Sequence, residues 1–241
     1  MSEELEVLKI VAERLRRADI AYMLTGSVAM NHYAVPRMTR DIDLVVELSS
    51  ADVDRVCRLF EADFDVDRQA VHHAVEIPAA FNMIHTALVV KVDIVVRKET
   101  EYRRTEFTRR RRLRVEGQEL FVVAPEDLIL SKLEWARESR SALQLADVRN
   151  LAESVNDTPA DVEARYRHML LARSGEDRLR MGFSMYATAR AMVVASILAS
   201  EPGASPERIR QAIFLRFYGR DFDEATRDRI AIRLARPTPM K

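Results

Sequence analysis

The chain has 241 residues, of which 48% are hydrophobic, with 38 Lys and Arg and 38 Asp and Glu side chains. This length and hydrophobic content suffice for one large domain or two small ones. Because the formal net charge is zero, the chain as a whole is not a generic polyanion binder, and any nucleic-acid contact must be local. The single cysteine, Cys57, excludes an internal disulfide and is typical of a reducing, cytoplasmic compartment.

Apolar residues at helical and alternating spacing predict an α/β fold with a mixed sheet and flanking helices. Ser27 is expected to cap a short helix, which Pro36 ends because the residue before a proline avoids the helical region. The predicted elements are, in order, helix 4–17, strand 20–24, helix 28–34, strand 42–46, helix 51–61, strand 64–66, helix 68–75, strands 81–85 and 91–96, helix 100–107, a hairpin over 113–123 turned at Gly117, and helices 126–136 and 143–151.

The turn-forming residues 156–159 divide this region from an all-helical C-terminal part. We predict a first domain over 1–155 and a helical domain over 156–241, which covers the sheet, forms a homodimer or binds a substrate. No N-terminal segment resembles a signal peptide, and the longest apolar run, 191–199, is too short to span a bilayer, so we expect no membrane partner. The C-terminal helices are predicted over 160–171, 176–200, 206–217 and 223–234.

Asp41 and Asp43 are two residues apart on a predicted strand, so their carboxylates share one face. Two carboxylates about 4 Å apart repel by roughly 4 kcal/mol at an effective dielectric near 20, unless one pKa rises or a cation binds. Hard oxygen ligands favour Mg²⁺ or Mn²⁺. Gly26 allows close backbone approach, and the N–H groups of the helix that follows favour a phosphate. This pattern suits a metal–nucleotide complex. The alternative is that Gly26-Ser27 is an ordinary helix start and that Asp41 and Asp43 are turn and strand-edge residues.

The pattern Gly26-Ser27, short helix, then Arg37-x-Thr39-x-Asp41-Ile-Asp43 resembles the nucleotidyltransferase superfamily, which includes DNA polymerase beta and kanamycin nucleotidyltransferase. Within that superfamily, the chain is similar to the nucleotidyltransferase-like toxins of the AbiE abortive-infection and MenT type. The resemblance covers residues 20–151 and implies the polymerase-beta-like fold. It also implies that Gly26 and Ser27 bind NTP phosphates, with Arg37 and Thr39 as further nucleotide contacts.

The resemblance implies a third metal ligand, Asp93, on the predicted strand 91–96. An isolated carboxylate between Val92 and Ile94 is costly unless it is paired or liganded. Spacing alone does not place Asp93 beside the first two aspartates. An ion pair with Lys91 or with an arginine is the alternative.

The stretch 125–151 resembles the paired C-terminal motifs of the same toxins. There a lysine in a Lys-Leu pair and an aspartate in an Asp-Val pair complete the active site, which by position gives Lys132 and Asp147. The chain departs from the pattern at Leu143-Gln144, where the family often has Lys-Asp. A surface lysine and a cap or ion-pair aspartate are the alternatives.

The arginine run over residues 109–112 is the most basic part of the chain. It predicts either a contact for nucleic acid or triphosphate or a solvated helix end and strand edge. No aromatic residues alternate with the arginines in a stacking pattern, which favours the second interpretation.

The resemblance implies a metal-dependent enzyme that transfers a nucleoside monophosphate from an NTP to an acceptor hydroxyl. Asp41, Asp43 and Asp93 would hold Mg²⁺ or Mn²⁺. We expect tRNA as the acceptor and an antitoxin as a partner, in a toxin–antitoxin or phage-defence system. The alternatives are a catalytically silent binding module of the same fold and a small-molecule nucleotidyltransferase that modifies antibiotics.

Overall fold

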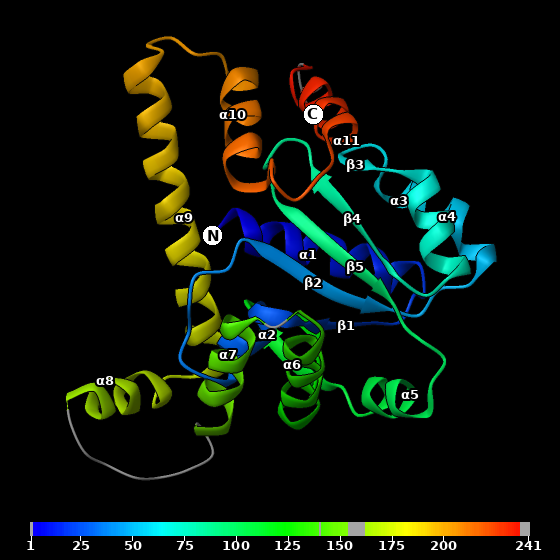
Figure 1. Ribbon diagram of the computed structural model, residues 1–241, viewed down its shortest axis with the longest axis vertical. Coiled ribbons are helices and arrows are strands. Elements are labelled where there is room, and N and C mark those ends of the chain that lie inside the picture. The colour runs from blue at the N-terminus through cyan, green and yellow to red at the C-terminus, as the bar shows by residue number, and fades with distance from the viewer. Residues whose placement is uncertain (1, 140, 154–161, 237–241) are drawn as a thin grey trace.

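The computed structural model describes residues 2–139, 141–153 and 162–236 (Figure 1). Seven strands of the described chain form one mixed sheet in the order β3-β4-β5-β2-β1-β7-β6. Neighbouring strands are antiparallel, except that β2 pairs with β5 and β1 with β7 in parallel. The strands are β1 (Tyr22–Thr25), β2 (Asp41–Val46), β3 (Phe64–Val66), β4 (Ala80–His85), β5 (Lys91–Val96), β6 (Arg111–Val115) and β7 (Gln118–Val122).

Helices flank this sheet and make up the C-terminal region, which confirms the predicted fold class of a mixed sheet followed by helices. They are α1 (Glu3–Arg17), α2 (Gly26–Tyr33), the 3-10 helix η1 (Ser50–Asp52), α3 (Val53–Phe60), α4 (Arg68–Glu76), α5 (Glu101–Thr108), α6 (Pro125–Ser139), α7 (Ala142–Glu153), α8 (Val162–Leu171), α9 (Gly175–Ser200), α10 (Pro206–Tyr218) and α11 (Glu224–Leu234).

Several predicted elements differ from the structure in their bounds, and two of the differences have a clear local cause. The helix predicted over 51–61 is divided into η1 and α3, because Ser49 and Asp52 form a capping box that closes a 3-10 turn first. The strand predicted from residue 20 begins at Tyr22, since Asp19 has a φ of 53° and the chain is still leaving α1 there.

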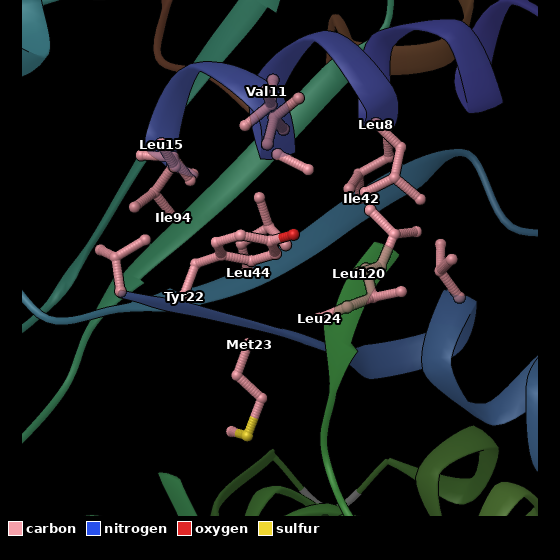
Figure 2. Packing of buried hydrophobic residues seen from close by; sticks show 14 of the residues in the cluster. Leu8, Val11, Leu15, Tyr22, Met23, Leu24, Ile42, Leu44, Ile94 and Leu120 are labelled. Atoms are coloured by element: carbon pink, nitrogen blue, oxygen red, sulfur yellow. The ribbon is translucent and has the colours of Figure 1, made fainter. Parts of the chain in front are cut away.

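The main hydrophobic core lies between α1 and one face of the sheet. In Figure 2 the side chains of Leu8, Val11 and Leu15 on α1 point toward Ile42 and Leu44 on β2. All of these residues are at most 2% exposed. Because side chains alternate along a strand, every second residue of β2 is committed to this core.

The residues between them point to the opposite face, where α2 and α6 lie (Figure 1). On β2 these are Asp41, Asp43 and Val45, and on β5 the alternation that buries Val92 and Ile94 leaves Lys91, Asp93 and Val95 on the same face. The core on one face therefore fixes a row of charged side chains on the other.

The C-terminal region contributes to two hydrophobic clusters. Leu179 and Phe183, from the first half of α9, belong to the main core. The second half of α9 joins α10 and α11 in a smaller cluster that also includes Ile84 and Val89 of the sheet region. The predicted boundary between residues 155 and 156 lies outside the described residues.

Helix α9 is long and apolar enough, by length and composition, to cross a membrane, and no other helix of the described chain passes that test. Its side chains Leu179, Phe183 and Tyr186 are nonetheless buried inside the protein. Only 28% of its most apolar 18-residue stretch is buried, so much of the apolar surface of this helix is exposed in the structure.

Candidate functional site

Three aspartates lie on one face of the sheet, on the neighbouring strands β2 and β5. Asp41 and Asp43 are two residues apart on β2, so their side chains point to the same side. The parallel pairing of the strands sets Asp43 opposite Asp93 and Asp41 opposite Lys91. The structure therefore brings together the three carboxylates that the sequence analysis singled out.

Gly26 begins α2 immediately beside Asp43. Its φ of +64° lies in the left-handed region, and a Cβ atom added to it would be 2.0 Å from Asp43 Oδ2. Thr25, the β1 partner of Asp43, is the N-cap residue, and within the described chain its side chain makes no capping hydrogen bond. The Thr25 side chain thus leaves the first backbone N–H groups of α2 uncapped. These groups lie next to the carboxylates, and N–H groups at a helix start favour the binding of a phosphate.

Burial and mutual repulsion raise the pKa values of these carboxyl groups. Loss of hydration, followed by the charges of Asp93 and Asp41, raises the pKa of Asp43 to about 7. Loss of hydration also raises the pKa of Asp41 to about 6 against the opposing charge of Lys91, and it raises the pKa of Asp93. Oδ1 of Asp41 is buried and has no hydrogen-bond partner among the described residues. The surroundings of these carboxyl groups therefore disfavour their ionised forms, which a bound cation would favour.

The ammonium group of Lys91 contacts two of the three aspartates. Its Nζ is 3.0 Å from Asp93 Oδ2 and 3.7 Å from Asp41 Oδ2. Loss of hydration acts to lower the pKa of Lys91, but the facing carboxylates raise it above its ordinary value. From the sequence alone, an ion pair of Asp93 with Lys91 is the alternative to a metal site. The structure has this ion pair and also places the three aspartates close together.

Lys132 and Asp147 form a buried ion pair between α6 and α7, with Nζ and Oδ2 2.7 Å apart. Arg37 donates two hydrogen bonds of 2.8 Å to the same carboxylate and one of 2.6 Å to Ser27 Oγ. Loss of hydration acts to raise the pKa of Asp147, but the hydrogen bonds from Arg37 and Lys132 outweigh it and lower the pKa. The alternative of a surface Lys132 is wrong, because this side chain is buried.

The structure gives Ser27, Arg37 and Thr39 side-chain contacts that the sequence did not predict. The prediction that Ser27 is the N-cap is wrong, because α2 begins at Gly26, two residues before the predicted start, with Thr25 as its N-cap. The Ser27 hydroxyl instead accepts a hydrogen bond from Arg37. The guanidinium group of Arg37 faces Asp147. Thr39 is buried, and its hydroxyl donates to the backbone carbonyl of Asp41 at 3.4 Å.

The arginine run is largely engaged with its own surface. Arg110 stacks over the rings of Phe107 and Phe121. The other three arginines are half-exposed or more and pair with acidic neighbours, of which Asp127 is buried; this favours the interpretation of a solvated strand edge. These pairs are Arg109–Asp127 at 3.4 Å, Arg111–Glu126 at 3.2 Å and Arg112–Glu119 at 3.8 Å.

The chemistry of the aspartate cluster fits a divalent cation. Three carboxylates supply the hard oxygen donors that Mg²⁺ and Mn²⁺ prefer, and the buried Oδ1 of Asp41 has no competing partner in the described chain. In the present side-chain conformations, no three acidic, histidine or cysteine side chains of the described residues surround a common point. Metal binding therefore requires these carboxylates to turn toward one point and Lys91 to withdraw from them.

Sequence reasoning missed Arg40 and Asp221. Arg40 precedes the first aspartate, with Nε 3.7 Å from Asp41 Oδ2, and this adjacency is a signal that could have found it. Asp221 lies between α10 and α11 and contacts Lys91 at 3.3 Å. No sequence pattern indicates that contact, because 130 residues separate the two side chains.

Comparison with known proteins gives one family match and seven similar chains among solved structures, two of which are described below. Residues 158–235 match a family model described as Rv0078B-related antitoxin. No curated protein matches the chain.

Among solved structures, an antigenic nucleotidyltransferase-like protein from Paracoccidioides brasiliensis is 20% identical, with a TM-score of 0.46 over 71% of this chain and 88% of that one. The lincomycin-bound lincosamide antibiotic adenylyltransferase LnuA is 14% identical, with a TM-score of 0.43 over 64% of this chain and 98% of that one. At these scores neither alignment assigns an activity to the chain.

Proposed function

We propose that this protein is a metal-dependent nucleotidyltransferase that transfers a nucleoside monophosphate from an NTP to an acceptor hydroxyl. The observation that carries the proposal is the pairing of β2 with β5, which sets Asp43 opposite Asp93 on the face that also carries Asp41. Oxygen donors gathered in this way suit a divalent cation, and the start of α2 at Gly26 suits the phosphates that such a cation accompanies.

Asp41, Asp43 and Asp93 would hold Mg²⁺ or Mn²⁺, which when bound neutralises phosphate charge and polarises the α-phosphate. The close approach of Gly26 supports this assignment. Because glycine has no Cβ atom, the backbone at the start of α2 can contact the Asp43 side chain. The phosphate end of a nucleotide and its cation would then be bound by adjacent groups.

The remaining roles follow from the chemistry of each side chain. The amides of Gly26 and Ser27 bind the NTP phosphates at the helix N-terminus. The acceptor oxygen forms a bond to the α-phosphorus as the bond to pyrophosphate breaks, and its proton passes to a carboxylate oxygen of Asp93. Lys132 contributes positive charge near Asp43, and Asp147 holds Lys132 in place through their buried ion pair.

We further propose that the chain acts in a toxin–antitoxin setting, with the nucleotidyltransferase as the toxin part. The antitoxin family match at residues 158–235 supports this setting and puts the antitoxin-related part in the same chain. The acceptor proposed is tRNA, supported by the resemblance of the Lys132 and Asp147 motifs to toxins of this type. The ion-paired arginines at 109–112 add no support to it.

The first test is nucleotide binding by the full chain. Isothermal titration calorimetry with each of the four NTPs and Mg²⁺ is expected to show binding of at least one NTP, lost when EDTA is added. Asp43→Asn keeps the side-chain size but removes one of the three charges, so we expect its affinity to fall by about tenfold or more. Asp54→Asn, an exposed aspartate on α3, is the matched control and should bind like the parent.

The acceptor is then identified by transfer of labelled NTP to total tRNA or to the other components of a cell lysate. Label on tRNA that disappears with Asp43→Asn supports the full proposal. Label only on a small molecule would replace tRNA as the acceptor. Binding of Mg²⁺–NTP with equal affinity by parent and Asp43→Asn would refute the assignment of the site.

A further inference from the structure

The C-terminal region lies against the end of the sheet where β2 and β5 begin (Figure 1). This is the end that carries Asp41 and Lys91, the first residues of their strands. Docking is not confined to apolar contact, because Tyr218 at the end of α10 donates a hydrogen bond of 2.8 Å to the carbonyl of Arg40. The turn that follows, between α10 and α11, therefore comes directly to the candidate site.

Asp221 on this turn bridges the two cations next to the aspartate cluster. Its Oδ1 is 3.0 Å from an Nη of Arg40, and its Oδ2 is 3.3 Å from Lys91 Nζ. Both cations also contact Asp41, each at 3.7 Å. Asp221 is thus a fourth carboxylate beside the cluster. It contacts the same two cations, Arg40 and Lys91, that contact the proposed metal ligand Asp41.

Arg40 is held in this position by several further contacts with α10. Its guanidinium group donates to the carbonyl of Phe217 and lies 5.7 Å from the ring centroid of Tyr218. The Tyr218 hydroxyl also pairs with that of Tyr186 on α9 at 2.9 Å, and both tyrosines are fully buried. The contact of Asp221 is therefore part of an ordered interface and not a loose surface ion pair.

An arginine and a lysine that together hold a carboxylate could equally hold a phosphate. In this structure the carboxylate of Asp221 occupies that position. Guanidinium and ammonium groups bind phosphate oxygens as readily as carboxylate oxygens. Phosphates of a nucleotide bound at the aspartate cluster would need cations at its rim, and Arg40 and Lys91 are the cations that lie there. While Asp221 occupies them, its negative charge also repels a polyphosphate.

We propose that Arg40 and Lys91 form a phosphate-binding pair for the NTP and that Asp221, from the antitoxin-related region, occupies this pair and blocks nucleotide binding within the same chain. This inference rests on the proposed function, since it concerns the same nucleotide. Binding of the nucleotide requires the α10–α11 turn to leave. The apparent dissociation constant then equals the intrinsic constant divided by the fraction of molecules in which the turn has left.

The test compares the full-length parent with Asp221→Asn, which has the same shape but cannot form the two ion pairs. Titration calorimetry with Mg²⁺ and each NTP is expected to give a dissociation constant about tenfold lower for Asp221→Asn. The matched control is Asp228→Asn, which makes the same charge change at an exposed position of α11 and should bind like the parent.

A second measurement separates release of the turn from a simple charge effect. Adding the tightest-binding Mg²⁺–NTP to the parent should speed amide hydrogen exchange over residues 218–223, because the nucleotide displaces Asp221. Slower exchange there would mean that the turn closes over the nucleotide, and it would overturn the inference.

Equal nucleotide affinity in parent and Asp221→Asn would also overturn it while leaving the proposed function intact. If neither protein binds any Mg²⁺–NTP, the proposed function itself fails and the inference fails with it.

Discussion

The close approach of Gly26 and Asp43 shows how one residue controls the candidate site. A side chain at position 26 would both require a positive φ of +64° and overlap the Asp43 side chain, including its Cβ at 2.8 Å. Rotation of Asp43 alone does not remove that overlap. The glycine is therefore required by the site geometry as well as by the backbone conformation.

Gly26→Ala is expected to destabilise the protein by about 2–4 kcal/mol, combining left-handed backbone strain with overpacking. Urea unfolding measures this change, and Mg²⁺–NTP affinity should fall at the same time because Asp43 is displaced. The matched control is Gly117→Ala in the β6–β7 turn, which has a φ of +84° and no described atom within 4 Å of the added Cβ. It should lose only the strain of about 1–2 kcal/mol, and equal losses in the two variants would contradict the steric explanation.

At the scale of elements, the packing of α1 against α9 buries an acidic side chain. Glu4 is 1% exposed in the first turn of α1. Arg190 of α9 pairs with the neighbouring Glu3, with Nε and Oε2 2.5 Å apart. Loss of hydration raises the pKa of Glu4 above its ordinary value of 4.5. The folded state therefore holds the Glu4 proton more tightly than the unfolded chain does.

The contribution of Glu4 to stability is thus fully present below pH 4.5 and is lost as the pH rises through its raised folded-state pKa. Glu4→Met removes the buried charge, so we expect a gain of about 1–3 kcal/mol at pH 8, offset by about 0.3–1 kcal/mol of lost helix-dipole interaction. Thermal unfolding at several pH values should show this gain shrinking toward pH 4. Glu6→Met, in the same turn with more solvent contact, controls for the dipole effect, and a gain independent of pH would contradict the prediction.

At the scale of the whole molecule, α10 and α11 are joined to the sheet by apolar packing and by two groups of ion pairs. One is the contact of Asp221 with the candidate site. The other is at β3, where the buried carboxylate of Asp65 accepts hydrogen bonds of 2.7 and 2.9 Å from Arg229 and one of 3.3 Å from Arg233. Because these arginines are both on α11, the second group of ion pairs holds α11 against the sheet, together with the apolar cluster that includes Ile84 and Val89.

Replacing Arg229 and Arg233 together by glutamine would leave Asp65 buried without a cation. This costs about 3 kcal/mol if α11 stays docked, so we expect undocking, with amide exchange in α10 and α11 faster by on the order of 100-fold. Exchange in β2 and β5 should not change. Arg227→Gln, on the same helix with only exposed ion pairs, is the control. Equal acceleration throughout the chain would instead show that sheet and C-terminal region unfold as one unit.

The sequence by itself determined the elements and the faces of the strands. Period-two alternation is a local property, so Asp41 and Asp43 had to share the face opposite Ile42, and Lys91 had to share that of Asp93. The β6–β7 turn at Gly117 and the capped starts of the C-terminal helices are equally local, because turn and cap chemistry act within a few residues.

Only the tertiary structure decided which elements meet. The sheet order places β5 beside β2, although two other strands lie between them in the chain, and the register of that pair puts Asp43 opposite Asp93. The contact of Lys91 with Asp221 depends on how α10 packs against the sheet. Such long-range pairings are selected by burial of the shared hydrophobic core and by the hydrogen bonds between neighbouring strands, and neither has a signature within a short stretch of sequence.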